Sequence, residues 1–474
     1  MIDQKIKLIT GSLLHDIGKV VYREGSDRRN HSVLGYDFLK EEGKIEDKEI
    51  LDCVRYHHFS EIKSARLKED NLAYIVYLAD NIAAFADRRK KEDTEEKGFD
   101  LSVPLQSVFN VLNGNNQSFY YQPGDMDDQG KINYPASEKK PFSREFYMKI
   151  CQRMLDNFRG MNWSEEYLNS LLAVMEANLS YMPSSTSNEE LSDISLFDHV
   201  KLTAAISSCI YDYLNENHLS YKTELFDKKD FYDRNAFLLC SMDISGIQSF
   251  IYTISSKNAL KTLRARSFYL EIMMEHIIDL LLDRLQLSRA NLLYSGGGHC
   301  YLLLANTTET VMQIQKFQEE LKEWLLKQFQ TDLFVAFGYV QCTGNAFRNV
   351  PEGSYTELFR KMSKMLSLQK QHRYTAREII RLNNRKEQDY SRECKVCKKI
   401  GHVDEEGVCP LCRKIEKLSK NVLYADFFSV ILENPDERED AMPLPGGYCL
   451  VADDEKKLCR RMENDDYFVR SYSK

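Results

Sequence analysis

The sequence predicts a multidomain α+β protein, and three observations lead to this prediction. The 474 residues are too many for one compact core, and 43% of them are hydrophobic, so two to four globular domains are expected. Histidines and aspartates gather in predicted helices near the start, a β-α-β-β-α-β order fills the middle, and two cysteine pairs follow. We therefore expect a helical domain over residues 1–95, a helical region with a long loop over 96–232, a ferredoxin-like domain over 233–390 and a zinc-bearing linker domain over 391–474.

The first domain contains a series of imidazoles and carboxylates suited to divalent metals. The candidate ligands are His15, Asp16, His31, His57, His58 and Asp80. Helices are expected at Ile6–Asp16, Val33–Glu41, Lys48–Tyr56 and Asn71–Phe85, so that all these ligands would lie on helices, which hold a ligand more firmly than loops do. Such a set holds one or two ions, for example Mn, Ni or Co, and leaves coordination positions open for water. Taken singly, each histidine is more often an ordinary surface or core residue, and only the ordered set favours a metal site.

The order of these ligands resembles that of HD-type metal-dependent phosphohydrolases, so we expect 1–95 to be a helical HD domain. In that interpretation His15 and Asp16 are the catalytic pair. With His57 and Asp80 they would hold the core metal, while His31 and His58 would bind a second metal or position phosphate.

The middle of the chain has the outline of a nucleotide-cyclase or polymerase palm. Strands are expected near 236–243, 291–294, 300–304 and 333–340, with helices at 260–285 and 308–329 between them. Asp243 occupies the position of the first metal-binding acid, but the hairpin turn reads Gly296-Gly297-Gly298-His299 where paired acids would stand. We expect no nucleotidyl transfer by this ferredoxin-like palm domain alone.

Two interpretations of that glycine-rich turn stay open. Asp243, Ser295, Gly296, Gly297 and Gly298 could form half of a nucleotide site, with ATP and Mg bound only together with a second palm. Alternatively, the glycines make a tight structural turn.

The cysteines predict a second type of metal site. Cys394 and Cys397 form one pair, Cys409 and Cys412 form the other, and eleven residues separate the pairs. Four thiolates complete a tetrahedral Zn site, and such a closed site is structural. His402, between the pairs, is expected to take no part.

Charge and hydropathy limit the partners. The net charge is −8, yet residues 360–399 contain thirteen Lys or Arg and four Asp or Glu, which indicates either a groove for a phosphate backbone or a solvated helix face. A helix is expected over Lys201–Leu214 with Asp198 as its N-cap. We see no membrane-length apolar run and no signal peptide, and scattered cysteines suit a reducing cytoplasm, so no membrane partner is expected.

Several motifs together resemble the large subunit of type III-A (Csm-type) CRISPR effector complexes. They are the His15-Asp16 domain, Ser195-Leu196-Phe197-Asp198-His199, Asp243-Ile244-Ser245-Gly246-Ile247-Gln248, Leu263-Arg264-Ala265-Arg266, the Gly296 turn and the two cysteine pairs. The motifs stand in the family's order and span nearly all of the chain.

The resemblance implies a single-stranded-DNA nuclease that is switched on when the complex binds target RNA. It also implies guide RNA and other Csm-type subunits as partners, and two palms that make cyclic oligoadenylates from ATP. In the family the second palm has a Gly-Gly-Asp-Asp turn, which this sequence lacks; we expect a fragment or a short form whose oligoadenylate synthesis needs that palm. Two alternatives remain: a non-catalytic scaffold that binds guide RNA and neighbouring subunits, and an HD phosphohydrolase of small nucleotides.

Overall fold

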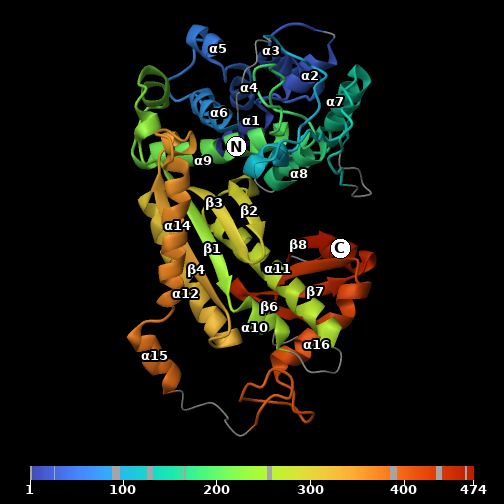
Figure 1. Cartoon of the computed structure of the whole chain (residues 1–474), viewed down its shortest axis with the longest axis vertical. Coiled ribbons are helices and arrows are strands. Elements are labelled where there is room, and N and C mark those ends of the chain that lie inside the picture. Colours follow the sequence, from blue (N-terminus) through green and yellow to red (C-terminus); the bar gives the residue numbers. More distant parts are fainter. Residues whose placement is uncertain are drawn as a thin grey trace.

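The chain folds into a helical body, a first antiparallel sheet that packs against this body, and a second antiparallel sheet that shares a core with the first (Figure 1). The computed structural model describes residues 3–473 apart from 26, 88–96, 125–131, 162, 165–166, 254–258, 385–391, 434–439 and 465–466. The predicted domain boundaries at 95/96 and 390/391 therefore lie outside the described residues. The coarse prediction of mixed helix and sheet is confirmed.

The helical body lies at the top of Figure 1 and contains the start of the chain. Its helices are α1 (Gln4–Leu14), α2 (Gly18–Glu24), α3 (His31–Asp37), α4 (Lys48–Arg55), α5 (Phe59–Ser64), α6 (Ala73–Asp87), α7 (Arg144–Phe158), α8 (Leu168–Leu179) and α9 (Leu196–Glu216). A π-helical turn, Phe38–Glu42, extends α3. Helix α9 packs against both α1 and α6, so residues far apart in sequence share one core.

The start of α9 differs from the prediction. The Ser195 side chain accepts a hydrogen bond from the backbone N–H of Asp198, which makes Ser195 the N-cap and rules out Asp198 in that role. The helix consequently begins five residues earlier than Lys201, and this places His199 within its second turn.

The first sheet is ferredoxin-like in connection and order. Its elements are β1 (Phe237–Ser245), α10 (Ile247–Tyr252), α11 (Ala259–Arg284), β2 (Leu292–Gly296), β3 (His299–Ala305), α12 (Thr308–Phe329) and β4 (Phe334–Cys342), and the strand order is β2-β3-β1-β4. The β2–β3 hairpin turns on Gly297 and Gly298, with φ of 61° and 80°, as a two-residue turn with positive φ at both positions requires. A Cβ on Gly298 would come within 2.4 Å of Ile247 Cδ1, so this position excludes larger residues. Helices α13 (Gly344–Phe347), α14 (Ser354–Gln371) and α15 (Ala376–Asn383) follow.

The last part of the chain forms a second four-stranded sheet within the range 391–474, for which only a zinc-bearing linker domain is predicted. It contains α16 (Pro410–Tyr424), β5 (Phe427–Leu432), β6 (Met442–Leu444), β7 (Tyr448–Asp453), α17 (Glu455–Asn464) and β8 (Phe468–Ser473). Its order, β6-β7-β5-β8, is that of the first sheet with each strand replaced by its counterpart. Helix α11 packs on both sheets, because its apolar side chains share one core with Leu238 of β1 and Val430 of β5.

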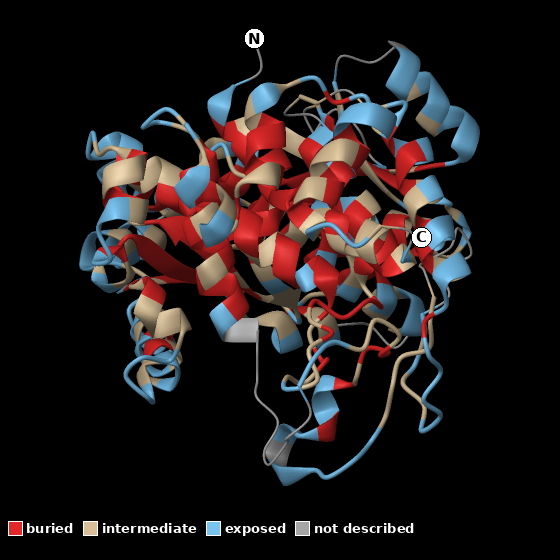
Figure 2. Cartoon of the chain, turned by 90° about the horizontal axis from the view of Figure 1, so that it is seen from above, coloured by how far each residue is buried: buried red, intermediate tan, exposed pale blue. Residues whose placement is uncertain are grey.

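Two apolar cores meet at the first sheet. One face of β1 packs on α11, and the opposite face packs on α6 and α9 of the helical body. Buried residues accordingly run through the centre of the molecule in Figure 2, and exposed residues lie at its rim. Among the described residues, none of the helices has the length and apolar character needed to cross a lipid bilayer.

Asn291 joins the helical body to the first sheet. Its side-chain amide is fully buried and donates hydrogen bonds to the Leu303 carbonyl at 2.8 Å and to Ser208 Oγ at 3.0 Å.

Replacing Asn291 by Ala removes both bonds at a cost of about 1–3 kcal/mol, so we expect the midpoint of thermal unfolding to fall by a few degrees in calorimetry. Asn157→Ala is the control, because the Asn157 amide is exposed and bonds only within α7. Equal unfolding midpoints for Asn291→Ala and Asn157→Ala would contradict the role of Asn291 in joining the helical body to the first sheet.

Candidate metal centres

Four of the candidate ligands lie at helix ends, not on the helices as the sequence suggested. His15 and Asp16 follow the last residue of α1, and His57 and His58 lie between α4 and α5. The last carbonyls of a helix have no partner in the helix itself. Nδ1–H of His15 donates to the Ser12 carbonyl and Nδ1–H of His57 to the Val54 carbonyl, each at 2.7 Å. Both rings are thereby held with Nε2 free to bind a metal.

The first ligand set brings together His15, Asp16, Asp80 and His199. One ligand atom of each lies within 4.8 Å of the others, and all four residues are buried. His199 Nε2 lies 3.2 Å from both Asp16 Oδ2 and Asp80 Oδ1, and His15 Nε2 lies 3.4 Å from Asp16 Oδ2. Two atoms that bind one ion at about 2.1 Å and 90–110° are themselves about 3.0–3.4 Å apart, so these spacings suit a shared cation.

The second set contains His31, His57 and His58, again with ligand atoms within 4.8 Å. Asp16 lies between the sets, because its Oδ1 is 3.3 Å from His31 Nε2 and 3.6 Å from His57 Nε2. The structure thus groups His57 with His31 and His58 rather than with the first set. The geometry has room for two ions with the Asp16 carboxylate between them.

His199 is a candidate ligand that sequence reasoning missed. It lies 184 positions after His15 in the chain, and α9 brings it between the carboxylates of Asp16 and Asp80. The available signal was a histidine on the apolar face of a helix, within the motif Ser195-Leu196-Phe197-Asp198-His199 that already supported the family resemblance. That signal alone does not separate a ligand from an ordinary core histidine.

Protonation in the site suits metal binding. Burial alone would raise the pKa of Asp16, but the Lys19 and His15 charges and hydrogen bonds from His199 and His31 hold that pKa well below its usual value. Burial also opposes ionisation of Asp80, yet the neighbouring imidazoles of His15 and His199 lower its pKa. Burial lowers the pKa of His58 to about 4. The carboxylates are therefore charged at neutral pH while His58 is neutral, as metal ligands need to be.

Buried ring nitrogens give an independent test of the fit. Nε2 of His15 and Nε2 of His57 are inaccessible to solvent, and no described residue forms a hydrogen bond with either atom. A buried polar atom without a partner is costly. Both atoms point toward the Asp16 carboxylate, so a cation beside that carboxylate would satisfy them.

The four cysteines also converge. Cys394, Cys397, Cys409 and Cys412 place their sulfurs within 4.8 Å of one another, and the Sγ atoms of Cys397 and Cys409 are 3.7 Å apart. Four sulfurs about 2.3 Å from a tetrahedral Zn are about 3.8 Å apart. The pKa of Cys397 is lowered to about 2, because the thiols of Cys409 and Cys412 donate to its sulfur. The cluster is consistent with zinc.

The predicted nucleotide-binding residues divide between the two faces of the first sheet. Asp243 pairs with His299 across β1 and β3, whereas Ser295 pairs with Cys300, the next residue of β3. Neighbouring residues of a strand point to opposite faces, so Asp243 and Ser295 do too. Asp243 bonds to His299 Nδ1 at 2.9 Å and to Lys370 Nζ at 2.7 Å, while Ser295 Oγ donates to Glu275 at 2.6 Å. Gly296, Gly297 and Gly298 lie at the β2–β3 turn between them.

Two family profiles match the chain at the places where these features lie. The profile described as HD domain covers residues 1–84, and the profile described as Csm1 subunit domain B covers residues 236–385. The chain thus joins an HD domain, with its ligand series, to a Csm1-type sheet domain.

Similarity to curated proteins extends over the whole chain. CRISPR system single-strand-specific deoxyribonucleases Cas10/Csm1 (subtype III-A) are 41% identical in Enterococcus italicus, 38% in Streptococcus thermophilus and 40% in Mycobacterium tuberculosis. The alignments cover 100%, 99% and 96% of this chain but 63%, 62% and 62% of those proteins. The chain is a homologue of the Cas10/Csm1 proteins of CRISPR subtype III-A, and it spans less than two thirds of the length of these relatives.

Solved structures are similar in fold. The match to the apo Csm1–Csm4 cassette has a TM-score of 0.70 and 24% sequence identity. It covers 96% of this chain and 56% of the matched cassette chain. The Csm1–Csm4 cassette in complex with pppApA has a TM-score of 0.64 at 27% identity, over 82% of this chain and 53% of its own.

Removing His199 tests the missed ligand. We expect His199→Ala to weaken Mn²⁺ binding by at least about 10–100-fold, because loss of a residue that only supports a metal ligand already has an effect of this size. Isothermal titration calorimetry of the full chain measures the affinity. His372→Ala is the control, because His372 is an exposed histidine at the end of α14. Unchanged Mn²⁺ affinity in His199→Ala would exclude His199 as a ligand.

Cys394→Ser tests the cysteine cluster. The substitution removes one of four thiolates, so we expect less than one equivalent of zinc by elemental analysis and faster proteolysis between 392 and 424. Cys459→Ser serves as the matched control, since Cys459 is an exposed cysteine outside the cluster. Full zinc content in Cys394→Ser would count against a four-thiolate site.

Proposed function

We propose that the chain is a metal-dependent nuclease that hydrolyses phosphodiester bonds in single-stranded DNA at its HD site. The observation that supports this most is the convergence of seven ligand residues in two adjacent sets around the Asp16 carboxylate. The relatives are named single-strand-specific deoxyribonucleases, and this name supports single-stranded DNA as the substrate class.

Each residue of the site has a role in this proposal. His15, Asp16, Asp80 and His199 would hold one ion, and His31, His57 and His58 a second, with Mn, Ni or Co the best suited to imidazole and carboxylate ligands. Bound ions of this kind supply a deprotonated water at neutral pH and neutralise phosphate charge. Lys19 Nζ lies 2.5 Å from Asp16 Oδ2 and balances the negative charge of that carboxylate.

We further propose that the chain works within a type III-A CRISPR complex. Relatives are named as Cas10/Csm1, and the structural neighbours are Csm1–Csm4 cassettes, so a Csm4-type subunit, guide RNA and target RNA are the proposed partners. Binding of target RNA would switch the nuclease on. Zinc at the four cysteines would stabilise the linker before the second sheet. The absence of disulfides among the twelve cysteines supports a reducing compartment such as the cytoplasm.

The first sheet is the proposed palm. Solved Csm1–Csm4 cassettes include complexes with one ATP and with cA4, which supports nucleotide binding by this kind of domain. The Asp243 carboxylate contacts His299 and the Lys370 ammonium, which balances its negative charge. We propose that it contributes half of an ATP site and that synthesis of cyclic oligoadenylates needs a second palm.

Asp16→Asn tests the nuclease proposal directly. The substitution removes the charge between the two ligand sets, so we expect cleavage of a 5′-labelled single strand with Mn²⁺ to fall at least about 100-fold, measured on denaturing gels. Asp212→Asn is the control, because Asp212 is a partly buried aspartate with a cationic partner, Lys5, outside the metal sets. Undiminished cleavage by Asp16→Asn would exclude the HD site as the nuclease, whereas a lack of cleavage by the unsubstituted chain would favour the scaffold. Turnover of dNTPs without cleavage of DNA would favour the small-nucleotide alternative.

A further inference from the structure

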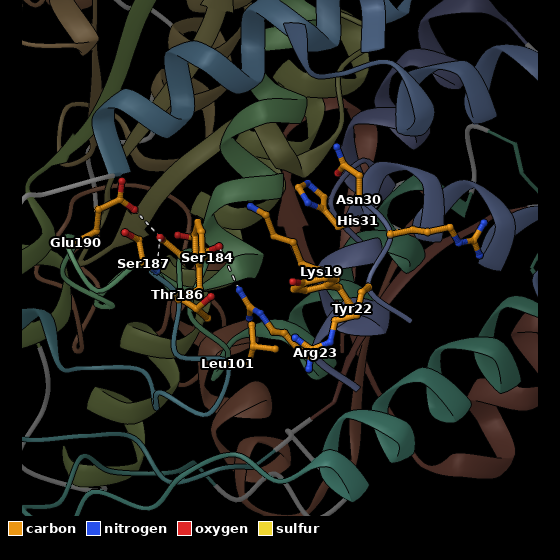
Figure 3. Close-up of a pocket in the computed structure, with 14 residues that line it drawn as sticks. Lys19, Tyr22, Arg23, Asn30, His31, Leu101, Ser184, Thr186, Ser187 and Glu190 are labelled. Atoms are coloured by element: carbon orange, nitrogen blue, oxygen red, sulfur yellow. Dashed lines mark hydrogen bonds between the residues drawn. The ribbon is translucent and has the colours of Figure 1, made fainter. Parts of the chain in front are cut away.

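A cavity of about 440 Å³ lies beside the HD ligands. One wall is formed by α2 and the segment before α3, and the other by residues 99–101 and 184–190. Figure 3 shows Tyr22, Asn30 and His31 on one side, Ser184, Thr186, Ser187 and Glu190 on the other, and Lys19 and Arg23 between them. The volume is within the range of small-molecule sites, which is about 300–1,000 Å³.

The cavity is continuous with the metal centre. His31 lines the cavity and belongs to the second ligand set, and Lys19 lines it while contacting Asp16. If the scissile phosphate of a single-stranded DNA lay at the two ligand sets, the neighbouring nucleotide of that DNA would lie in this cavity.

The residues that line the cavity carry a net positive charge. They include four cationic side chains, Lys19, Arg23, Arg28 and Arg29, and one carboxylate, that of Glu190. Three of these cations already have partners: Arg29 pairs with Asp27 and Asp37 at 2.8 Å each, Arg23 donates to the Pro183 carbonyl, and Lys19 contacts Asp16. The Arg28 side chain is exposed, and only its backbone amide contacts Asp27. Its guanidinium is therefore available to a phosphate.

Two aromatic rings also line the cavity. Phe99 is 75% exposed although it is apolar, and its backbone is held by a β-bridge to Ser187 on the same wall. Tyr22 of α2 is partly buried. Aromatic faces beside cationic side chains are the usual surface for unpaired bases, because every base can stack on them whatever its sequence.

We propose that this cavity binds the nucleotide next to the scissile phosphodiester of a single-stranded DNA, with its base on Phe99 and a phosphate on Arg28. The inference rests on the proposed nuclease function and extends it to a subsite. The hydroxyls of Ser184, Thr186 and Ser187 border the cavity and can contact sugar or phosphate oxygens, which positions a strand without reading its sequence.

Binding measured without cleavage tests the subsite. Fluorescence anisotropy of the full chain with 5′-fluorescein-labelled oligo(dT), without added divalent metal, gives the affinity. We expect Phe99→Ala to weaken binding about 5- to 100-fold. We expect Arg28→Ala to reduce the slope of log affinity against log salt by about 0.7, the value for one phosphate contact on a single strand.

Matched controls are Phe109→Ala and Arg159→Ala. Phe109 is an exposed phenylalanine outside the cavity, and Arg159 is an exposed arginine at the end of α7, also outside the cavity. Unchanged affinity in both Phe99→Ala and Arg28→Ala would overturn the proposal, and so would a duplex that competes as well as the single strand, because its bases are not free to stack. Hydrolysis of bis(p-nitrophenyl) phosphate with Mn²⁺ tests the metal chemistry separately. Activity on this small diester together with unchanged oligo(dT) affinity would leave the nuclease proposal standing and remove only the subsite.

Discussion

The Asp16 carboxylate is almost completely buried, and four imidazoles and the Lys19 ammonium contact it. An ionised carboxylate in such a place is destabilising by several kcal/mol unless charged or hydrogen-bonding partners surround it. These partners come from the end of α1, from α2, from the start of α3, from the loop after α4 and from α9. The packing of the helical body is therefore constrained by one side chain, since each of these elements has to bring its group to the same point.

Helix α6 shows how the fold accommodates this constraint. Between Ala73 and Ala86 its sequence is almost entirely apolar, and Asp80 is the single charged residue in that stretch. The apolar residues place the helix deep in the core shared with the first sheet, and this depth removes Asp80 from water. The same packing that stabilises the helix thus produces the electrostatic environment of the site.

Much of the site could be predicted from the sequence, because metal chemistry depends on residue type and these types are rare together. The residue types at positions 15, 16, 31, 57, 58 and 80 were sufficient to predict a metal centre. The spacing of the cysteines was sufficient to predict a closed four-sulfur cluster. His199 could not be assigned, since only the packing of α9 against α1 and α6 places it there. The division of Asp243 and Ser295 between two faces depends on strand register, which residue order alone does not give. The second sheet was not predicted, although β5, β7 and β8 have six residues each; its fourth strand, β6, has only three residues, too few for a recognisable alternation of apolar and polar side chains.

The position of α9 has a consequence for dissecting the protein. This helix supplies His199 to the metal set and also fills the interface between α1, α6 and β3. A truncation after the first hundred residues would delete one of the ligands and leave the apolar sides of two helices facing water. The candidate metal centre and the first sheet thus share one core, and a fragment that keeps both ligand sets has to extend at least through residue 216 and include a cover for the exposed side of α6.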